Sequence, residues 1–362
     1  MAQLAQALAA AGDSVEVHVP GPWSPPPATG GLPVHVLPDR FGPRSVAVLR
    51  EAQRRAPAVM LLQHSPFNYG ARGMNLLFPH LLRTIPGPLA VMFHEVAFPR
   101  EPGQPLRHAL LAQAQRQMAR ALLARASAAC VSTTAWNPTL ASLGWSGPIT
   151  LLPIPSNLLP PPALPSRAVL RAGLSLADGD VVVGHFGTYG APVAGPLAAT
   201  LPALLAGAPS RRALLLGRGA GRFREQLLRA HPGLEAQLCI PGNEEAAQVS
   251  RALVACDVLL QPFEDGVTTR RTSFMAALAH GRPVCTNRGP LTEAGWESLA
   301  GVHLAPNARG ESLRETTETL LARGREAWDE SGRQAAGTYA QHFSLDQCVP
   351  ALRELAVRLE AA

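Results

Sequence analysis

Short apolar segments alternate with longer amphipathic ones along most of this chain, in two blocks that a proline-rich stretch separates. Apolar runs of about 4–8 residues are typical of strands that are buried on both faces, and the segments between them have helical spacing. The pattern therefore predicts an α/β protein whose parallel sheets are covered by helices on both sides.

The first block begins with a helical pattern that Gly12 closes, followed by the alternating segment "SVEVHVPG". Further strands are predicted over 57–65, 87–95, 128–136 and 149–157, with a long helix over 106–127. Because this α/β chain starts on a helix, we expect that a first strand and its loop are missing at the N-terminus.

The stretch "NLLPPPALPSR" is rich in proline and predicts a stiff linker. Beyond it, strands are predicted over 180–188, 211–221, 236–242, 256–263 and 282–289, with helices between them. The two blocks predict two doubly wound domains, 1–160 and 161–340, that face each other across a cleft.

Ligands of doubly wound sheets bind beyond the carboxyl ends of the strands, so the residues that follow each strand are candidates. On the first block these are His64, Asn68, Tyr69, His94 and Glu95, and on the second Gly187, Thr188, Arg218, Glu264, Asp265 and Gly266. "GRGAG" at 217–221 fits a strand-to-helix turn better than a phosphate loop, because the G-x-G-x-x-G spacing fails. "DGD" at 178–180 is interpreted as a turn before a strand rather than a metal site.

Two pairs of side chains have both a functional and a structural interpretation. His94 and Glu95 directly follow an apolar strand, where a histidine can serve as an acid or base or can be a packed structural residue. Glu264 and Asp265 precede a glycine and can act as acid/base groups, as ribose ligands, or as a solvated turn. For both pairs the sequence leaves the functional and the structural interpretation open.

The segment "EDGVTTRRTSFMAALAHGRPV" places Arg270 and Arg271 directly before a predicted apolar helix. Thr272 or Ser273 is expected to cap that helix, which Gly281 ends. Free N–H groups at a helix start favour an anion, and arginine forks bind phosphate through two hydrogen bonds. We therefore expect these four residues to bind a phosphate or diphosphate, with an ion pair to a nearby acid as the alternative.

Composition excludes several classes of chemistry. All 32 basic residues are arginine, so neither a Schiff-base lysine nor a P-loop lysine is available. The five cysteines are far apart, which indicates neither a zinc site nor a disulfide framework. Aromatic residues make up only 5 % of the chain, which argues against nucleic-acid binding despite the formal charge of +6. With no leader or membrane span evident, a cytoplasmic protein is expected.

The segment "CDVLLQPFEDG…SFMAALAHGRPVCTNRG" resembles the nucleotide-binding region of retaining glycosyltransferases with the GT-B fold, the group 1 sugar transferases. "DVVVGHFGTYG", "ALLLGRGAGRFREQLLRA" and "VSRALVACDVLLQPF" are similar to successive strand and helix segments of that family's second domain. The resemblance is specific in the second half and loose in the first. It implies two Rossmann-like domains and a closing helix over 341–362 that crosses back to the first.

The resemblance also implies roles for individual residues. Glu264 matches the family glutamate near the donor sugar, and His94 matches a histidine that contacts it, so both are expected to be catalytic. Gly187 and Thr188 would lie beside the diphosphate. No metal or cofactor is implied, because the nucleotide sugar is the substrate.

Three departures from the family pattern stand out. A second glutamate, which holds the ribose in the family, falls on Ala276. The basic pair expected after "GHFG" is absent, and we hypothesise that Arg270 and Arg271 replace it. The missing first strand is the third departure.

The sequence thus predicts the transfer of a sugar from a nucleotide-diphosphate donor to a saccharide, lipid-linked or small-molecule acceptor, and the resemblance implies that the reaction proceeds with retention. A non-catalytic relative that acts as a partner or scaffold, and a nucleotide-sugar epimerase or hydrolase, are the alternatives. The helix over 106–127 carries Arg107, Arg116, Arg120 and Arg125 among apolar residues. It either covers the sheet or makes peripheral contact with anionic lipid at the inner membrane face.

Overall fold

The chain divides into two compact units. The computed structural model describes residues 2–21, 30–100, 103–242 and 245–361. Unit 1 comprises residues 1–153 and 345–362, and unit 2 comprises residues 154–344. The boundaries thus fall at 153/154 and 344/345, against the expected 160/161 and 340/341.

Unit 1 contains two parallel sheets. A two-stranded sheet pairs β1 (Val17–Pro20) with β2 (Val34–Leu37). A four-stranded sheet holds, in chain order, β3 (Met60–His64), β4 (Leu89–Phe93), β5 (Ala128–Val131) and β6 (Ile149–Leu151). The helices are α1 (Ala2–Ala10), α2 (Pro43–Arg55), α3 (Leu77–Leu81), α4 (Leu106–Leu123), α5 (Asn137–Ser142) and α13 (Leu345–Glu360). Short 3₁₀ turns lie at Pro66–Tyr69, Ala71–Gly73, Leu82–Thr84 and Thr134–Trp136.

The core of unit 1 lies between β4, β5 and the helices α2, α3, α4 and α5. α1 packs against the closing helix α13, and Asp13 accepts a hydrogen bond from Arg353 at 3.1 Å. The chain's last helix therefore belongs to the same unit as its first.

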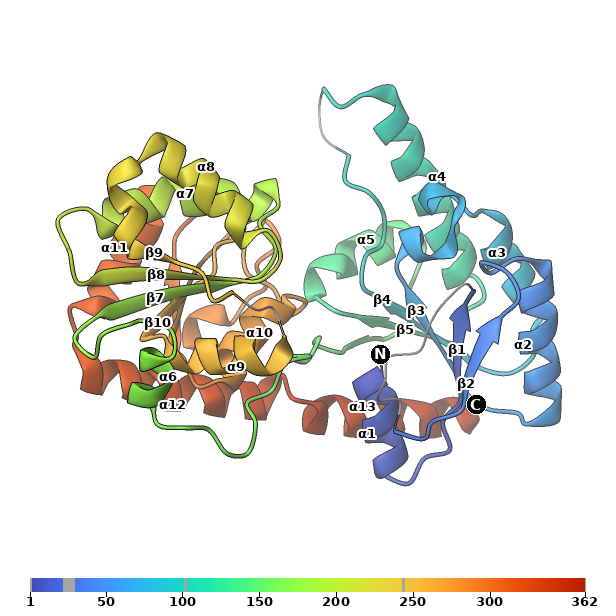
Figure 1. Cartoon of the computed structure of the whole chain (residues 1–362). Helices are drawn as coiled ribbons and strands as arrows, with labels where there is room; N and C mark the ends of the chain where they lie inside the picture. The colour runs from blue at the N-terminus through green and yellow to red at the C-terminus, as the bar shows by residue number, and fades with distance from the viewer. Residues whose placement is uncertain (1, 22–29, 101–102, 243–244, 362) are drawn as a thin grey trace. The chain divides into compact units, whose positions relative to one another are not determined.

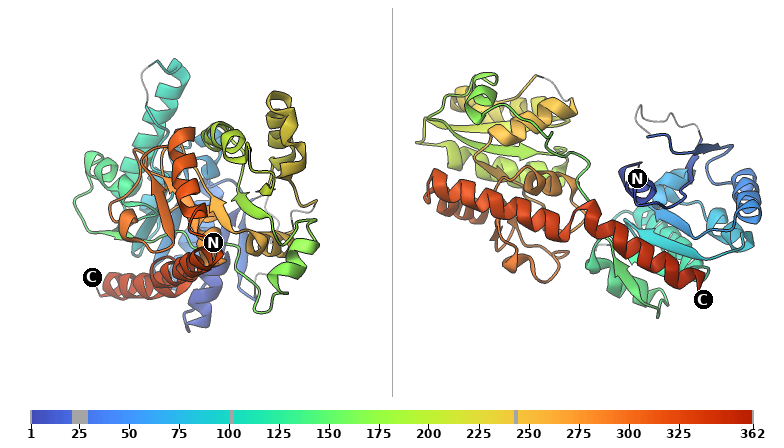
Figure 2. Two further views of the ribbon diagram at one scale, coloured as in Figure 1. Left: turned by 90° about the vertical axis from the view of Figure 1, so that its left-hand side faces the viewer. Right: turned by 90° about the horizontal axis from the view of Figure 1, so that it is seen from below.

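Helix α4 ends at Leu123, four residues before the predicted 127. Arg125 lies beyond the helix, where its guanidinium donates to the main-chain oxygens of Ile85 (2.8 Å) and Gly87 (2.5 Å). This anchoring turns the chain toward β5 and removes Arg125 from the helix surface. Figure 1 and the left view of Figure 2 show the first turns of α4 standing away from the sheet of unit 1.

Unit 2 has one six-stranded parallel sheet with the order β12-β11-β10-β7-β8-β9. Its strands are β7 (Val181–Phe186), β8 (Arg211–Leu216), β9 (Leu238–Cys239), β10 (Val258–Leu260), β11 (Val284–Asn287) and β12 (Val302–Ala305). Renumbered within the unit this is the 3-2-1-4-5-6 order of a dinucleotide-binding sheet, whose order reverses between β7 and β10.

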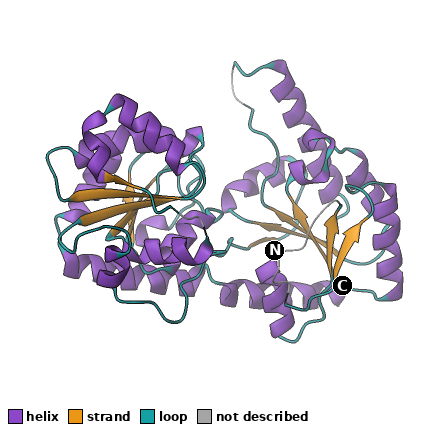
Figure 3. Cartoon of the chain, viewed as in Figure 1, coloured by secondary structure: helices purple, strands orange, loops and turns teal. Residues whose placement is uncertain are grey.

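Helices cover both faces of this sheet (Figure 3). They are α6 (Arg167–Ala172), α7 (Ala191–Leu205), α8 (Ala220–Ala230), α9 (Ala246–Ala255), α10 (Thr272–Ala279), α11 (Gly310–Leu321) and α12 (Arg325–His342), with 3₁₀ turns at Pro232–Gln237 and Trp296–Ser298. Because successive strand residues face opposite sides, Val182 and Leu214 pack with α9, α10 and α12, while Val183 and Leu215 pack with α7, α8 and α11.

A buried carboxylate at the amino ends of β7 and β10 ties α6 and α12 to the sheet. Asp257 accepts hydrogen bonds from Val182 N (2.7 Å), from Arg171 (2.6 Å) and from Arg167. Arg325, the first residue of α12, lies 3.4 Å from the same carboxylate. The opposite, carboxyl edge of the sheet is thereby left to the loops that carry the candidate site.

Among the described residues, no helix has both the length and the apolar composition that crossing a membrane requires.

Candidate functional site

The predicted residues of unit 2 gather at the point where the strand order reverses. β7 and β10 are hydrogen-bonded neighbours, so Gly187, after β7, and Glu264, in the loop after β10, lie at the same edge of the sheet. This is the place where doubly wound sheets bind ligands.

The loop between β10 and α10 is organised by one carboxylate. Asp265 pairs with Arg270 at 3.0 Å and with Arg271, and all three side chains are less than a third exposed. The Arg271 guanidinium also lies over the ring of Phe263, 4.6 Å from its centroid. Two guanidinium groups share one carboxylate, so this group of three side chains has an excess of one positive charge.

A second carboxylate, Glu293, fastens the same loop and was missed by the sequence analysis. Its Oε1 accepts from Thr269 N at 3.1 Å and from Thr269 Oγ1 at 2.6 Å. Its Oε2 accepts from the Trp296 indole at 2.8 Å. Nothing local in "LTEAGWES" distinguishes this glutamate, because its partner is 24 residues away.

Glu264 is an exposed residue of this loop. Its main-chain N–H donates to Pro192 O at 3.0 Å, which fixes the residue to the start of α7. Its carboxylate makes none of the hydrogen bonds or ion pairs found among the described residues. Gly266 has φ +87° and a Cβ there would lie 2.4 Å from Gly289 N, so the close passage of the two chain segments requires glycine.

The start of α10 corrects one expectation. Neither Thr272 nor Ser273 is the N-cap, because the helix begins at Thr272 and its N-cap is Arg271, with no side-chain capping bond. The helix therefore starts earlier than expected. Arg271 is held by its ion pair with Asp265, and Thr269 by its hydrogen bond to Glu293, so the chain is fixed just before Thr272. Ala276, which matches the family's ribose-binding position, is completely buried in the core.

The loop after β7 approaches the loop after β8. A Cβ on Gly217, whose φ is +98°, would lie 2.3 Å from the Gly187 oxygen, so only glycine fits there. Thr188 and Arg218 are exposed on these two loops. A Cβ on Gly187 would meet His185 Nε2 at 3.5 Å and Ser273 Oγ at 3.6 Å, which are ordinary van der Waals contacts.

The predicted residues of unit 1 centre on His94, the residue after β4. Its Nε2 lies 2.7 Å from Gln63 Oε1, and since an amide oxygen accepts, the imidazole carries its proton on Nε2. Burial lowers the pKa of His94 to about 4, so the ring is neutral at physiological pH. Its main-chain oxygen accepts from the Trp136 indole at 3.2 Å, and the neighbouring Glu95 is exposed. Gln63 was not predicted from the sequence.

The expected acceptor residues of unit 1 differ in accessibility. His64 and Tyr69 are 0 % and 1 % exposed, and His64 Nδ1 lies 3.1 Å from the Tyr69 hydroxyl. Burial lowers the pKa of His64 to about 3 and raises that of Tyr69. Asn68 is exposed between them. In this structure Asn68 and Glu95 are open to solvent, whereas His64 and Tyr69 support the strand end from within.

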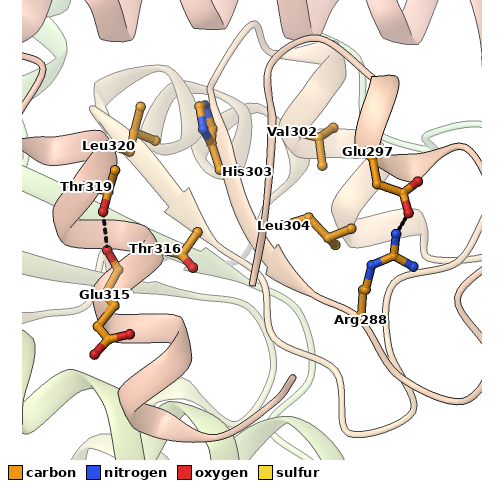
Figure 4. Close-up of a pocket in the computed structure, with 9 residues that line it drawn as sticks. All are labelled: Arg288, Glu297, Val302, His303, Leu304, Glu315, Thr316, Thr319 and Leu320. Carbon is orange, nitrogen blue, oxygen red and sulfur yellow. Dashed lines mark hydrogen bonds and ion pairs between the residues drawn. The ribbon is translucent and has the colours of Figure 1, made fainter. Parts of the chain in front are cut away.

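A cavity of about 470 Å³ lies away from these residues, at the edge strand β12 (Figure 4). Val302, His303 and Leu304 of β12 line it together with residues of α11, and Arg288, which pairs with Glu297, lines it too. None of the residues predicted from the sequence lines it. Among the described residues, no group of three or more His, Cys, Asp or Glu side chains is arranged to hold a metal ion.

Sequence comparison finds no relatives, since no family model and no curated protein matches the chain. Solved structures do match it. Sucrose-phosphate synthase from Thermosynechococcus elongatus is 18 % identical, with a TM-score of 0.75 over 99 % of this chain and 92 % of that one. Anabaena HepE, solved with UDP and glucose, is 18 % identical, with a TM-score of 0.62 over 91 % and 87 %. WaaG, a glycosyltransferase involved in lipopolysaccharide biosynthesis, is 15 % identical, with a TM-score of 0.63 over 98 % and 94 %.

These neighbours have the GT-B fold, and this chain shares it. The prediction of an α/β chain with two Rossmann-like domains of this type is confirmed. At such identities the similarity concerns the fold, and the activity has to be argued from the site.

Proposed function

We propose that this protein is a glycosyltransferase that takes a sugar from a nucleotide-diphosphate donor, and that Arg270 and Arg271 hold the diphosphate at the start of α10. The observation that carries the proposal is the arginine pair, fixed by Asp265 beside a helix start that no side chain caps, at the reversal point of the sheet. Helix N–H groups and guanidinium forks are suited to phosphate oxygens. Structural neighbours solved with UDP or UDP-glucose support a nucleotide-sugar donor.

In this proposal the positive charge of Arg270 and Arg271 stabilises the leaving group. As the sugar departs, negative charge grows on the diphosphate, and the two guanidinium groups with the α10 N-terminus stabilise it. Glu264, with its exposed carboxylate, would stand near the donor sugar, and the family resemblance alone gives neutral His94 a contact with that sugar. We propose retention on the basis of the family resemblance. We assign no nucleophile, because a double displacement like that of retaining glycosidases needs two carboxylates about 5 Å apart, and we identify no such pair.

The first test is thermal unfolding against UDP, GDP, ADP, TDP, CMP and their common sugar conjugates. Binding to the folded state raises the unfolding midpoint by mass action, so one nucleotide should stand out. The double variant Arg270→Ala/Arg271→Ala should abolish that shift. Arg314→Ala, which removes a partly exposed arginine paired with Glu318 on α11, is the matched control and should keep it. An unaltered shift in the double variant would refute the role of the arginine pair.

Two alternatives differ in their products. A nucleotide-sugar epimerase or hydrolase would convert the donor without any acceptor, giving an isomerised donor or free sugar. A non-catalytic relative is favoured by the burial of Ala276, which leaves no ribose-binding side chain at that position. Incubating the selected nucleotide sugar with and without an acceptor panel separates the three, because only a transferase releases nucleotide in an acceptor-dependent way.

We further propose that unit 1 contacts anionic lipid through the start of α4, as a transferase with a lipid-linked acceptor would. Leu106 and Leu110, one turn apart, are 76 % and 61 % exposed, and Arg107 beside them is also exposed. Such a combination of apolar and basic side chains favours an anionic lipid surface. Of the four predicted arginines, Arg107 and Arg120 are exposed, whereas Arg116 and Arg125 are partly buried.

Flotation with anionic vesicles tests this contact. Wild-type protein should float with them, and Leu106→Ser/Leu110→Ser or Arg107→Gln/Arg120→Gln should not. Val357→Ser, on α13, removes an apolar side chain of similar exposure (65 %) and should leave flotation unchanged. Equal flotation of all variants, or none of the wild type, would contradict the contact.

A further inference from the structure

Four arginines converge at the amino edge of the unit 2 sheet, the edge opposite the candidate site. Each guanidinium group contacts one of the two residues that precede β10, either the main-chain oxygen of Cys256 or the carboxylate of Asp257. Figure 1 shows α6 and α12 side by side, and both helices contribute to the group. The four are Arg167 and Arg171 of α6, Arg282 before β11, and Arg325 of α12.

The carboxylates in contact with these arginines do not balance their charge. Among the described residues, the ion pairs of the four arginines involve two acids, the buried Asp257 and the half-exposed Asp329. The turn before β7 adds no carboxylate contact, because Asp180 pairs with Arg212 at 3.3 Å and Asp178 contributes its main-chain oxygen. The four arginines therefore have two positive charges in excess of their ion-pair partners.

Arg282 has no carboxylate partner within the described part of the chain. Its Nε donates to His280 O at 3.4 Å and its Nη1 to Cys256 O at 3.2 Å, while its Nη2 makes none of the hydrogen bonds found among the described residues. Burial lowers the pKa of Arg282, and the charge of Arg167 lowers it further. A half-buried guanidinium group with another cation near it thus lacks a negative partner.

Arg167 brings a second guanidinium group to the same place. Its Nη2 donates at 3.2 Å to the oxygen of Cys256, which also accepts from Arg282, so the two groups share one acceptor. Its Nη1 lies 3.3 Å from Asp329, and its Nε is buried without a hydrogen-bond partner among the described residues. Because the side chains of Arg167 and Asp329 are 23 % and 48 % exposed, this place can be reached from solvent.

Two guanidinium groups that converge on one point are suited to the oxygens of a phosphate group. We propose that Arg167 and Arg282 bind a phosphate dianion, either inorganic phosphate or a phosphate monoester, at the amino edge of the unit 2 sheet. Its charge of nearly two at neutral pH matches the excess of the four arginines. The oxygens would accept from Arg282 Nη2 and Arg167 Nη1, for which Asp329 competes. This site is separate from the proposed donor site and does not depend on it.

Thermal unfolding with inorganic phosphate and with methyl phosphate, at constant ionic strength, tests the site. Binding to the folded state should raise the unfolding midpoint and saturate in the millimolar range, whereas the general salt effect of phosphate does not saturate. A shift with both compounds identifies a monoester site, and a shift with inorganic phosphate alone identifies a site for the free ion. The wild-type chain and Arg270→Ala/Arg271→Ala are both measured, because the double variant removes the proposed donor site.

Substitutions in the site should have opposite effects. Arg282→Gln removes the unpaired charge and should weaken phosphate binding at least about tenfold, and Arg167→Gln should act in the same direction. Asp329→Asn should strengthen binding, because it removes the competing carboxylate. Arg333→Gln, also on α12, removes an arginine that is 69 % exposed and pairs with Glu330, and as the matched control it should bind normally.

These opposite effects distinguish phosphate binding from a general change in stability. An unfolding midpoint of the wild-type chain that phosphate does not change would overturn the proposal, and so would a shift that Arg282→Gln leaves intact. A shift that disappears in Arg270→Ala/Arg271→Ala would assign the phosphate to the proposed donor site and also overturn the amino-edge site. A chain that responds to phosphate and binds no nucleotide sugar would retain this site and lose the proposed donor site.

Discussion

At the scale of single residues, Gln63 determines which ring nitrogen of His94 carries the proton. The amide oxygen accepts from His94 Nε2 at 2.7 Å, and burial holds the pKa of the imidazole near 4. Gln63→Glu places a carboxylate at the same position. An opposite charge within about 4–6 Å favours the charged imidazole, so the pKa of His94 should rise by about 1–3 units. A histidine-resolved NMR titration measures it.

Gln63→Leu is the control for this substitution. It removes the acceptor without adding charge, so the pKa of His94 should remain low, because burial is the larger cause of the shift. If the glutamate and leucine variants titrated alike, the side chain of residue 63 would not govern His94.

The sequence located candidate residues at the strand ends but not the partners that hold them. His94 and Glu264 could be found because each lies beyond a recognisable apolar strand. Gln63 and Glu293 could not, since each acts on a residue more than twenty positions away in a manner that no local pattern encodes. An ion pair of the arginines with a nearby acid, Glu264 or Asp265, could be expected because these residues are close in the sequence, whereas the N-cap of α10 at Arg271 could not.

At the scale of elements, Asp257 joins α6, α12 and the first strand of unit 2. Its side chain is fully buried and accepts a hydrogen bond at 2.6 Å from the guanidinium of Arg171, which is buried as well. Asp257→Asn removes the charge that balances a buried arginine. We expect a loss of about 3–5 kcal/mol in the free energy of unfolding of unit 2, measured by urea unfolding.

Asp329→Asn is the matched control for this prediction. Asp329 pairs with Arg167 at 3.3 Å but is 48 % exposed, so water screens the pair. Its loss should cost less than about 1 kcal/mol. Equal effects of the two substitutions would mean that Asp257 is not the fixed point that joins these elements.

Apolar strands were easier to predict from the sequence than the short polar elements between them. The expected strands at 57–65, 87–95 and 180–188 contain β3, β4 and β7. β2 and α2 were missed, although Pro43 at the first position of α2 is a helix-start signal. What fixes that start is Asp39, which accepts from Gly42 N at 2.7 Å and from Ser45 N at 3.2 Å. A polar turn of this kind has no hydrophobic periodicity, so the pattern of apolar residues does not reveal it.

At the scale of the whole molecule, buried neutral histidines make stability depend on pH. Burial lowers the pKa of His64 to about 3 and those of His94, His185 and His303 to about 4, against 6.5 for an unburied histidine. Between these values the unfolded chain binds a proton at each position and the folded chain does not. The free energy of unfolding therefore falls as pH falls from about 6.5 toward 4, by up to about 1.4 kcal/mol per pH unit and histidine.

Because His64 and His94 belong to unit 1 and His185 and His303 to unit 2, both units should lose stability in acid. Urea unfolding at about pH 7.5 and 5.5, followed by circular dichroism, measures it in a range where carboxylates remain ionised. The midpoint should be lower at the acidic pH, and His303→Gln should flatten the dependence of unit 2 alone. A midpoint that does not change with pH would show that these histidines become protonated without unfolding.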